Sequence, residues 1–556
     1  MMKKCKMMLR PVFLPVTILS LLTALTLLAC GDGKKASGSS GAVASIDADL
    51  VFPPAEKQTL TMLTQSSVLA PEDPNSKLIW KRYEALTNVH VSWINYTSDI
   101  FYEKRNLLMA TNSLPDAIFD AGLSNYDILT YAKNGSIVPV EELVNRYMPR
   151  LKAIYDKYPV YRAGVTAPDG HIYTFPWIEE LGAGKDSIHS IAAIPWINTA
   201  WLKNLGLSMP ATIDEFTAVL RAFKNQDANR NGSVSDEIPL SYIFNDGGNT
   251  VNTLLGSFGY GDNGDHYIVD NNGKVLFTMA DNGYKEGIKW LNQLYREGLI
   301  DIEVFTQDWN TYAAKGKAQK YGVFFTWDMG NVSGFVSGDY SDPDHIVSDY
   351  APMPMLRGPD GLKNLARSNG RGYDRGRMAI TADNKNPVLT AKWIDGLYDP
   401  IQSPQNNWGT YGDTTQANIF ELDGSMLKHL PLNGVSPVEL RQKTNVGGPL
   451  AILDENYNKS VTIPDDAAWR MNIVSTVYVP DMYADNIYPP AFWSQADIAE
   501  LVDIETPLRD YAMSKQAEWI QSGNIDAQWD SYLAELNRLK LPRYLEVLQK
   551  YYDAAR

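Results

Sequence analysis

The chain has 556 residues, 44% of them hydrophobic, and a formal net charge of −15 at pH 7. This length can bury a substantial core, and at ~150 residues per domain it indicates two or three lobes. The acidic balance argues against nucleic-acid binding and against adhesion to anionic lipid through a basic patch, because both need clusters of Lys and Arg.

The first 29 residues have the pattern of a secretory signal: a basic start, an apolar middle and small residues at the end. The basic residues are Lys3, Lys4, Lys6 and Arg10, and the apolar run extends from Pro11 to Leu28. Leu27-Leu28-Ala29-Cys30 resembles a bacterial lipobox. This resemblance implies cleavage before Cys30 and the attachment of fatty-acyl chains such as palmitate to that cysteine. The alternative is an uncleaved anchor helix, although prolines and hydroxyl residues dilute the run.

Removing the signal takes away four basic residues and no acids, so the mature charge would be −15 − 4 = −19. Cys5 would leave as well, so the mature chain would have Cys30 alone and no intramolecular disulfide. Attachment to the extracytoplasmic face of the cell membrane would then depend on the acyl chains of Cys30. Each methylene buried in the bilayer contributes ~0.8 kcal/mol to the free energy of membrane binding. Residues 30–47 are small and polar, which indicates a flexible tether.

Strand and helix patterns alternate from residue 59 onward. Thr59–Leu63 alternates as a strand suited to a sheet edge, Asp73–Leu86 has a helical pattern, and Val89–Ile94 is the next strand. Leu114–Asp120 is a turn leading into a short buried strand, with Asp120 as a candidate ligand-binding residue. Strand, helix, strand is the pattern of a parallel α/β sheet.

Two later helices carry recognisable ends. Thr212 and Glu215 form a capping box before an apolar stripe, and Tyr284–Arg296 is followed by Gly298 as a helix-terminating glycine. The C-terminal section, Asp497–Arg556, is helical in pattern with breaks near Gly523 and Pro542.

Several stretches together resemble the solute-binding lipoproteins of bacterial carbohydrate ABC importers, in the branch that includes alginate- and pectin-oligosaccharide binders. The stretches are Trp201–Leu207 through Pro210 to Phe216, Gly273–Val275, Tyr284–Gly287, Leu294–Asp301, Asn386-Pro387, Trp393–Tyr398, and Trp519 to Leu545. They span most of residues 170–556. One departure is Asn198-Thr199-Ala200, where the family usually has an Arg and an Asp.

The resemblance implies an α/β, two-lobed periplasmic-binding-protein-like fold with a ligand cleft between the lobes and a helical C-terminal section. The expected N-terminal lobe is 48–172 plus 328–404, and the expected C-terminal lobe is 173–327 plus 405–556. A monomer would capture an oligosaccharide by hinge closure and deliver it to membrane permease subunits.

A loop from Asp227 to Glu237 follows the ligand order of an EF-hand. Oxygen side chains stand at positions 1, 3 and 5, a glycine at 6 and a main-chain carbonyl at 7, but position 12 is Ile238. The predicted ligands of a structural Ca²⁺ are Asp227, Asn229, Asn231, Ser233, Asp236 and Glu237. The alternative is an Asn-Gly turn in a solvated loop.

The chain has 14 tryptophans and 31 tyrosines. Aromatic planes can cover the C–H faces of sugars, but most aromatic residues serve the core. Trp201, Trp290, Trp393, Trp519 and Trp529 sit in helical patterns and are assigned to packing. The candidates for the cleft lie in expected loops: Trp177 with Glu179, Trp327, Trp408 with Tyr411, and Trp493.

A basic cluster stands out in this acidic chain: Arg367, Arg371, Tyr373, Arg375 and Arg377. Guanidinium groups bind carboxylates, so a uronate-containing sugar is one interpretation. Local pairing with Asp374 and other acids is the alternative, and a neutral oligosaccharide remains open.

The rival functions are a secreted carbohydrate-active enzyme and a binder of peptides or another small solute. We find no His-Glu-x-x-His, no Gly-x-Ser-x-Gly and no phosphate loop, and the six histidines are widely spaced. The sequence therefore favours a binding protein without a catalytic site.

Overall fold

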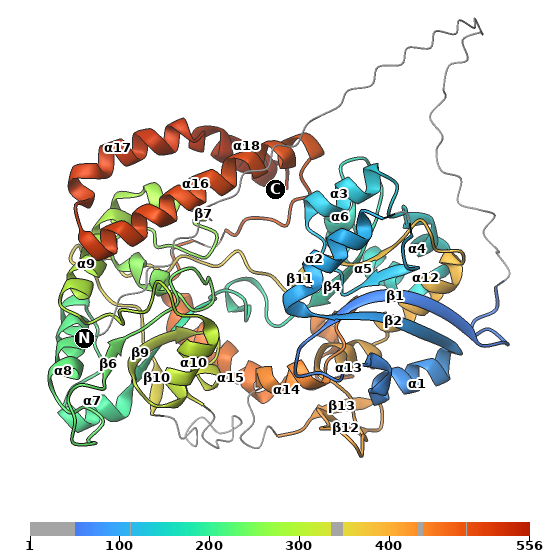
Figure 1. Ribbon diagram of the computed structural model, residues 1–556, viewed down its shortest axis with the longest axis horizontal. Helices are drawn as coiled ribbons and strands as arrows, with labels where there is room; N and C mark the ends of the chain where they lie inside the picture. Colours follow the sequence, from blue (N-terminus) through green and yellow to red (C-terminus); the bar gives the residue numbers. More distant parts are fainter. Residues whose placement is uncertain (1–49, 112, 335–348, 432–436, 485, 556) are drawn as a thin grey trace, which may run out of the picture. The chain divides into compact units, whose positions relative to one another are not determined.

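Two β-sheets organise the chain, and each sheet joins strands that lie far apart in the sequence (Figure 1). The structure, a computed structural model, describes residues 50–111, 113–334, 349–431, 437–484 and 486–555. The predicted signal peptide, the predicted lipidation site Cys30 and the predicted tether to residue 47 lie outside the described residues.

The larger sheet has six strands in the order β14-β4-β11-β3-β1-β2, and the smaller has four in the order β10-β5-β9-β6. β12 with β13 and β7 with β8 form two-stranded ribbons. The strands are β1 (Gln58–Ser66), β2 (Val89–Thr97), β3 (Ala117–Phe119), β4 (Phe175–Glu179), β5 (Ile194–Asn198), β6 (Ile238–Leu240), β7 (Tyr267–Val269), β8 (Val275–Phe277), β9 (Tyr321–Thr326), β10 (Tyr350–Pro352), β11 (Tyr373–Ile380), β12 (Phe420–Asp423), β13 (Met426–His429) and β14 (Leu450–Ile452).

Helices connect and cover these strands. The α-helices are α1 (Leu78–Thr87), α2 (Ser98–Met109), α3 (Asn125–Lys133), α4 (Glu141–Tyr147), α5 (Pro149–Lys157), α6 (Pro159–Val165), α7 (Thr199–Leu205), α8 (Ile213–Asn225), α9 (Asn282–Arg296), α10 (Trp309–Lys317), α11 (Gly330–Ser333), α12 (Pro387–Asp395), α13 (Gln402–Trp408), α14 (Pro437–Thr444), α15 (Asp465–Ile473), α16 (Gln495–Ser522), α17 (Ile525–Arg538) and α18 (Leu541–Ala554). Short helices of other types are η1 (Pro74–Ser76), η2 (Gly184–Asp186), η3 (Val251–Ser257), η4 (Thr278–Ala280), η6 (Gly396–Tyr398), η7 (Asp454–Asn456), η8 (Val474–Tyr478) and η9 (Val479–Asp481).

The predicted strand–helix–strand unit at the start of the fold is confirmed. β1 pairs with β2 in parallel from Gln58↔Val89 to Ser66↔Thr97, with α1 between them in the sequence, and β1 also pairs in parallel with β3. The prediction of an edge strand is wrong, because β1 lies between β3 and β2. Its apolar side chains are buried and both of its edges are paired, so β1 is a central strand.

The smaller sheet is buried on both faces. All residues of β5 and β9 are buried, and successive side chains point to opposite faces as the pleat requires. Trp196 and Phe324 pack in one hydrophobic cluster with Tyr478, whereas Val323 and Phe325 pack in another with residues of α8 and α9. A sheet covered on both faces explains why its strands are continuous apolar runs.

The predicted C-terminal helices are confirmed and pack as a group (Figure 1, red). α16 contacts α9, α17 and α18, and the breaks fall around Gly523 and just before Pro542. All five tryptophans assigned to packing are indeed buried: Trp201 (3% exposed), Trp290 (7%), Trp393 (1%), Trp519 (0%) and Trp529 (5%).

Local signals at the helix ends also hold. The Thr212 hydroxyl accepts from the Glu215 amide, and the Glu215 carboxylate accepts from the Thr212 amide, so α8 begins with the predicted capping box. Gly298 follows α9 with a φ of +67°, the left-handed conformation expected after a helix.

The expected lobe boundaries need correction, because strand pairing assigns several segments to the other sheet. β4 and β14, expected in the C-terminal lobe, belong to the six-stranded sheet with β1 to β3. β10, expected in the N-terminal lobe, pairs with β5 of the four-stranded sheet. The chain therefore passes between the sheets in the segments 180–193 and 353–372, and α15 contributes Ala467 to a cluster beside β14 and Ile473 to one beside β5.

Within the part of the chain that the structure describes, no helix combines the length and the apolar character that crossing a membrane requires.

Candidate functional site

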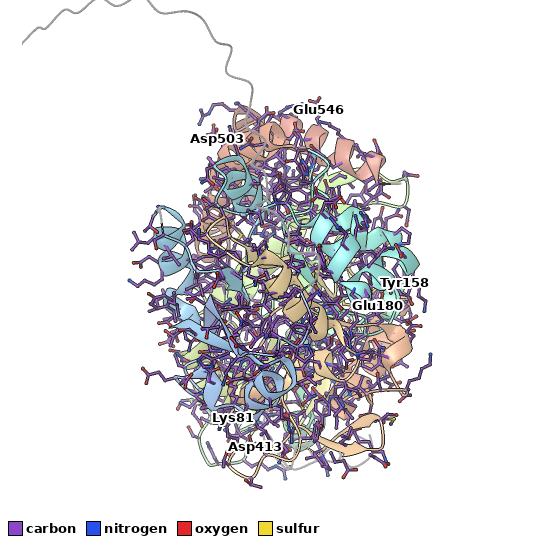
Figure 2. All side chains as sticks on the ribbon, turned by 90° about the vertical axis from the view of Figure 1, so that its right-hand side faces the viewer. Lys81, Tyr158, Glu180, Asp413, Asp503 and Glu546 are labelled. Atoms are coloured by element: carbon purple, nitrogen blue, oxygen red, sulfur yellow. The ribbon has the colours of Figure 1, made fainter. Side chains whose placement is uncertain are left out.

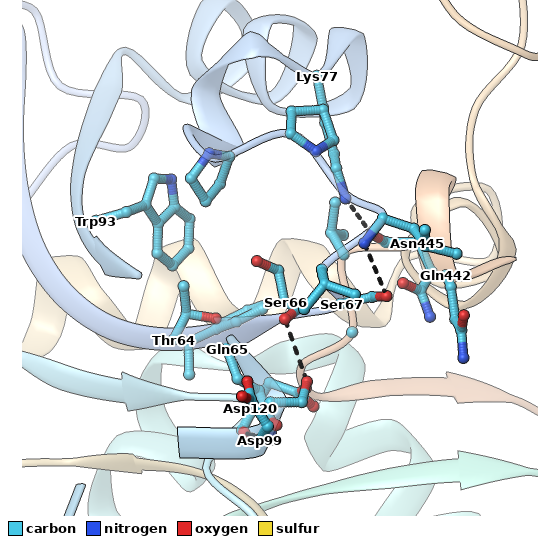
Figure 3. Close-up of a pocket in the computed structure, with 18 of the residues that line it drawn as sticks. Thr64, Gln65, Ser66, Ser67, Lys77, Trp93, Asp99, Asp120, Gln442 and Asn445 are labelled. Atoms are coloured by element: carbon cyan, nitrogen blue, oxygen red, sulfur yellow. Dashed lines mark hydrogen bonds between the residues drawn. The ribbon is translucent and has the colours of Figure 1, made fainter. Parts of the chain in front are cut away.

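A pocket lies where three strands of the larger sheet end (Figure 3). β1, β2 and β3 are parallel, so their carboxyl ends meet at one edge, which is where α/β sheets generally bind ligands. The pocket has a volume of about 580 Å³, in the range of small-molecule sites. We call it the strand-end pocket; its lining includes Thr64–Leu69, Lys77, Trp80, Trp93, Asp99, Phe119, Asp120, Trp309, Asn310, Gln442 and Asn445–Gly447.

Aromatic rings form one wall of the strand-end pocket. The Trp93 ring lies 5.3 Å from the rings of both Trp80 and Phe119, and its indole nitrogen donates to Asn75 Oδ1 at 3.0 Å. Trp80 and Phe119 also line the pocket, but at 5% and 1% exposed they are more enclosed and pack against Trp93. Trp309 of α10, which is 39% exposed, adds a further indole to the lining. These planes can cover the apolar faces of a ring-shaped ligand.

Asp120 is held in an unusual backbone conformation beside the pocket. Its φ is +49°, in the left-handed region that side chains other than glycine rarely adopt. Gln65 Nε2 donates to the Asp120 carbonyl at 2.9 Å (Figure 3), and Arg377 forms an ion pair with the carboxylate at 2.7 Å. The Gly448 amide also donates to this carboxylate, at 3.2 Å. Strain of this kind is common at binding sites, because the surroundings fix the side chain's direction.

Lys77 contributes a buried amine to the lining of the strand-end pocket. It is 5% exposed, and its Nζ donates to the Asn445 carbonyl at 2.5 Å (Figure 3). Burial lowers the pKa of Lys77 to about 8, because the interior disfavours the charged form. The amine can therefore act as a hydrogen-bond donor, and its charged form is less favoured than in an exposed lysine.

Three of the predicted site residues form one connected polar group near the strand-end pocket. Arg377, which pairs with Asp120, also lies 5.9 Å from the ring of Trp177. The Trp177 indole donates to Asn407 Oδ1 at 3.2 Å, and Asn407 Nδ2 donates to Glu179 at 3.0 Å. Burial raises the pKa of Glu179 to about 7, with the Arg441 charge and the Asn407 bond opposing the shift. Trp177 and Glu179 lie in β4, not in the expected loop.

Trp327 packs against a buried arginine. Arg470 lies 3.5 Å from the Trp327 ring centroid and donates to the carbonyls of Trp327, Ile188 and Ile191. Burial lowers the pKa of Arg470 to about 9. The adjacent Asp328 is 6% exposed, and burial together with the nearby Asp466 raises its pKa to about 6. Trp327 thus belongs to a buried ionic group that connects the end of β9 with α15 and with the segment before β5.

The remaining predicted residues lie elsewhere. Arg371 and Tyr373 line a separate pocket of about 380 Å³ together with Glu179. The Trp408 prediction is wrong: Trp408 ends α13, is 2% exposed, and packs against Phe420, so it leaves no face to a ligand. Tyr411 stacks under Arg82 at 4.2 Å, and Trp493 lies 6.0 Å from Tyr551.

The basic cluster is used mainly for local contacts. Arg377 pairs with Asp120 and Asp374, Arg371 donates to the Tyr488 carbonyl at 3.0 Å, and Arg375 donates to Asn125 and to the carbonyls of Pro490 and Ala491. Arg377 thus shows the local pairing with acids that was the alternative to uronate binding, whereas Arg371 and Arg375 contact neutral groups, and the buried Arg371 Nε has no hydrogen-bond partner among the described residues.

The sequence reasoning missed most of the strand-end pocket. Trp93 was placed correctly in a strand but was not connected with a site, and Gln65, Lys77 and Trp309 carried no motif. A usable signal was present for part of the pocket: once β1, β2 and β3 are predicted to be parallel, the residues at their carboxyl ends, such as Gln65 and Asp99, must meet at one edge. This signal does not reveal Lys77, Trp93 or Trp309.

The calcium-like loop connects α8 to β6, so it is not flanked by two helices. The Asp227 carboxylate accepts from the amides of Asn231 (3.0 Å) and Gly232 (2.9 Å), and Gly232 has a φ of +90°. Asn229 and Asn231 both donate to Asp236 Oδ2, and Ser233 Oγ lies 3.1 Å from Ser235 Oγ.

Two carboxylate oxygens in this loop have unmet hydrogen-bonding capacity. Asp236 Oδ1 and Glu237 Oε2 are buried and have no hydrogen-bond partner among the described residues. These oxygens fit a hard cation, which binds oxygen ligands. Elsewhere in the described chain, as in this loop, no group of three or more His, Cys, Asp or Glu side chains has a metal-binding arrangement.

Comparison with known proteins identifies the class. Residues 79–400 match the family model of bacterial extracellular solute-binding proteins. The chain is 53% identical over 529 residues to the fructooligosaccharide ABC transporter substrate-binding protein FusA of Streptococcus pneumoniae, with 95% of each chain covered. The chain belongs to the bacterial extracellular solute-binding proteins.

Solved structures support the same assignment. The structure of FusA in complex with kestose matches with a TM-score of 0.85 and 54% identity, covering 89% of this chain and 99% of that one. A FusA EF-hand mutant in complex with fructo-nystose matches with the same score, identity and coverage. The predicted periplasmic-binding-protein-like α/β fold is thereby confirmed.

Proposed function

We propose that this protein is the extracytoplasmic substrate-binding component of an ABC importer and that it captures a neutral, fructose-containing oligosaccharide. The observation that carries the proposal is the strand-end pocket, in a chain 53% identical to a fructooligosaccharide-binding protein over 95% of its length. The protein would bind its ligand without altering it and pass it to membrane permease subunits.

The chemistry of the strand-end pocket suits a sugar. The Trp93 plane would cover an apolar C–H face, and amides and hydroxyls would bond the sugar hydroxyls. The neutral polar side chains of the lining include Gln65, Ser66, Ser67, Asn310, Gln442 and Asn445.

The charges of the same lining favour a neutral ligand over a uronate. Asp99 and Asp120 contribute two carboxylates, whereas Lys77 is the one cation among the described lining residues, and burial lowers its pKa to about 8. Because Arg377 already pairs with Asp120, a carboxylate ligand would find Lys77 as the one countercharge among the described lining residues, whereas a neutral oligosaccharide needs none.

We further propose that the two sheets mark two lobes that close on the ligand. The first lobe would comprise 50–179 and 373–464, and the second 194–352 and 473–555. Trp309 and Asn310 of α10 follow β6 in the second lobe, yet line a pocket otherwise built beside the larger sheet. Rotation about the connecting segments would therefore change the pocket's lining.

Calorimetric titration tests the sugar proposal. We expect kestose and nystose to bind wild-type protein, and digalacturonate to give no heat. Trp93→Ala should weaken kestose binding at least ~30-fold, the loss of a central aromatic anchor (~2 kcal/mol). Tyr126→Ala, an exposed aromatic on α3 outside the pocket, is the control. Equal affinity in the Trp93 and Tyr126 variants would refute the assignment of the pocket, and hydrolysis of kestose would support the enzyme alternative.

A structural calcium ion in the Asp227–Glu237 loop is also part of the proposal. It is supported by the oxygen ligands of the loop, the two buried carboxylate oxygens without partners, and the EF-hand in FusA. We expect Ca²⁺ at ~100 times its Kd to stabilise the protein by ~2.7 kcal/mol in chelator-controlled melts. Asp227→Asn should reduce that gain, whereas Asp503→Asn, at an exposed position on α16 (Figure 2), should keep it.

Lipid attachment at Cys30 and localisation at the outer face of the cell membrane complete the proposal. The lipobox-like sequence before Cys30 supports it. Labelled palmitate should be incorporated into wild-type protein and not into Cys30→Ser. Labelling of the variant would overturn this part.

A further inference from the structure

A second, larger cavity of about 940 Å³ lies beside the outer helices of the larger sheet. Its walls come from α1, the α4–α5 junction, α12 with η6, and α13. We call it the basic cavity, after the charged residues of its lining: Arg82, Arg146, Arg150, Lys152 and Lys392, with Asp395 and Asp399. Arg82 and Tyr411, which both line the cavity, stack at 4.2 Å; Figure 2 labels Lys81 and Asp413, which lie next to Arg82 and near Tyr411 in the sequence.

The charge of the basic cavity is opposite to that of the whole chain. Five cations and two acids give the lining a formal charge of +5 − 2 = +3, in a protein of net charge −15. Both acids already accept backbone N–H groups. Asp395 accepts from Arg150 at 3.0 Å and Leu151 at 3.1 Å, and Asp399 accepts from Ile401 at 2.9 Å. These bonds fix both carboxylates in place, and Lys152 pairs with Asp156, which is not among the lining residues, at 2.5 Å.

Two of the arginines are available to an occupant. Arg146 is exposed, lies 5.5 Å from the Tyr147 ring, and forms no ion pair with any described residue. Arg150 has a side chain that is 49% exposed, and it reaches Asp395 and Asp399 only at 3.5 Å each. Guanidinium groups in such positions bind oxyanions through paired hydrogen bonds.

The lining of the cavity also contains a polar group without a hydrogen-bond partner among the described residues. Tyr147 is 9% exposed, and its hydroxyl makes no hydrogen bond to any described residue. Lys392 Nζ lies 5.8 Å from the same ring. The rest of the lining is largely carbon, including Phe52, Ile79, Tyr83 and Leu86, so the cavity suits a ligand with an organic body as well as an anionic group.

We propose that the basic cavity is a second binding site, separate from the sugar pocket, for a glycerol phosphate ester that carries a net negative charge. The choice of phosphate rests on the proposed lipid attachment at Cys30. Lys392 Nζ donates to the carbonyl of Leu50, and Phe52 lines the cavity, so the cavity borders the segment that follows the predicted tether. Phospholipid headgroups and soluble glycerol phosphates share this chemistry. The net charge of the chain gave no indication of this local excess of cations.

The test is titration of the full chain in neutral detergent with three probes: short-chain phosphatidylglycerol, sn-glycerol 3-phosphate, and short-chain phosphatidylcholine. Arg146→Gln should weaken the binding of the anionic probes about tenfold (~1.4 kcal/mol). Arg146→Lys should keep part of that affinity. Arg296→Gln removes an exposed arginine at the end of α9 and should change nothing.

The outcomes separate the sources and the proposals. Binding of phosphatidylglycerol but not of sn-glycerol 3-phosphate supports a lipid headgroup, and binding of the soluble ester supports a free metabolite. Absence of binding by both anionic probes, equal binding of phosphatidylcholine, or equal loss in Arg146→Gln and Arg296→Gln would overturn the site. Kestose affinity, measured on the same variants, should stay unchanged, so failure of this site leaves the sugar proposal independently testable.

Discussion

The strand-end pocket and the basic cavity share helix α1 and differ in almost everything else. α1 contributes Trp80 to the strand-end pocket and Ile79, Arg82 and Tyr83 to the basic cavity. The first lining is rich in neutral amides and hydroxyls, whereas the second carries five cations. A single amphipathic element can therefore separate two ligand classes, because residues one position apart on a helix point in directions ~100° apart.

Among the tests of this difference between the two cavities, we expect the largest effect on stability from replacing Lys77, the cation of the strand-end pocket. The pKa of Lys77 is about 8 in the folded chain, below its usual value near 10.5, so burying the charge costs ~3 kcal/mol. Lys77→Met removes this cost but also the bond to Asn445. We expect a net gain of ~2 kcal/mol in the free energy of unfolding at neutral pH.

The sign of the pH dependence follows from the lowered pKa. The penalty is complete below pH ~8 and disappears as the pH rises toward ~10, so the wild-type protein should approach the variant there. Urea unfolding at several pH values measures the difference. If the free energies of unfolding of the two proteins differ by the same amount at every pH in that range, burial does not lower the pKa of Lys77. The strand-end pocket would then not disfavour a charged side chain.

A glycine supports the strand-end pocket alone. Gly447 has a φ of +65°, and a Cβ at this position would lie 2.8 Å from Asp120 Cγ. Gly447→Ala should push the Asp120 carboxylate away and weaken kestose binding about tenfold (~1.4 kcal/mol). Binding at the basic cavity should not change.

The β12–β13 turn offers a matched control. Gly424 has a φ of +61°, and a Cβ added there would have no neighbour within 4 Å, so Gly424→Ala imposes the backbone strain without the contact. It should lower stability but leave kestose affinity intact. Equal affinity losses in the two variants would mean that backbone strain alone, and not Asp120, explains the effect.

The stability of a Tyr147 variant tests one feature of the basic cavity without any ligand. Its buried hydroxyl lacks a partner among the described residues, so Tyr147→Phe should leave the melting temperature unchanged or raise stability by up to ~1 kcal/mol. Differential scanning calorimetry measures this. A loss of more than ~1 kcal/mol would show that the hydroxyl has a structural partner after all, and would remove one argument for an occupant.

The smallest predicted effect concerns the rim of the strand-end pocket. Trp309 is 39% exposed and comes from α10, so it is less enclosed than Trp93. Trp309→Ala should weaken kestose binding about threefold (~0.7 kcal/mol), well below the effect of Trp93→Ala. Titration of both variants compares them directly; a larger loss at Trp309 would place the sugar nearer to α10 than we propose.

The elements of the fold were largely predictable because their signals are local. The capping box at Thr212, the glycine after α9 and the apolar stripes each involve residues within a few positions of one another. The site was less predictable. Asp120, Trp177 and Glu179 were predicted and lie in one connected group, but Trp408 sits beside polar residues and glycine in the sequence while its side chain is buried.

The class of protein was indicated by the family resemblance of several stretches, whereas the sequence by itself determined the helix and strand periods and the oxygen-rich loop at Asp227, since short-range pattern suffices for these. Only the tertiary structure decided that β4 and β14 join the sheet of β1, that Gln65 and Trp93 line one pocket, and that cations from four helices surround one cavity. These contacts link residues tens to hundreds of positions apart, and no local pattern records which distant partner a buried strand or charge will find.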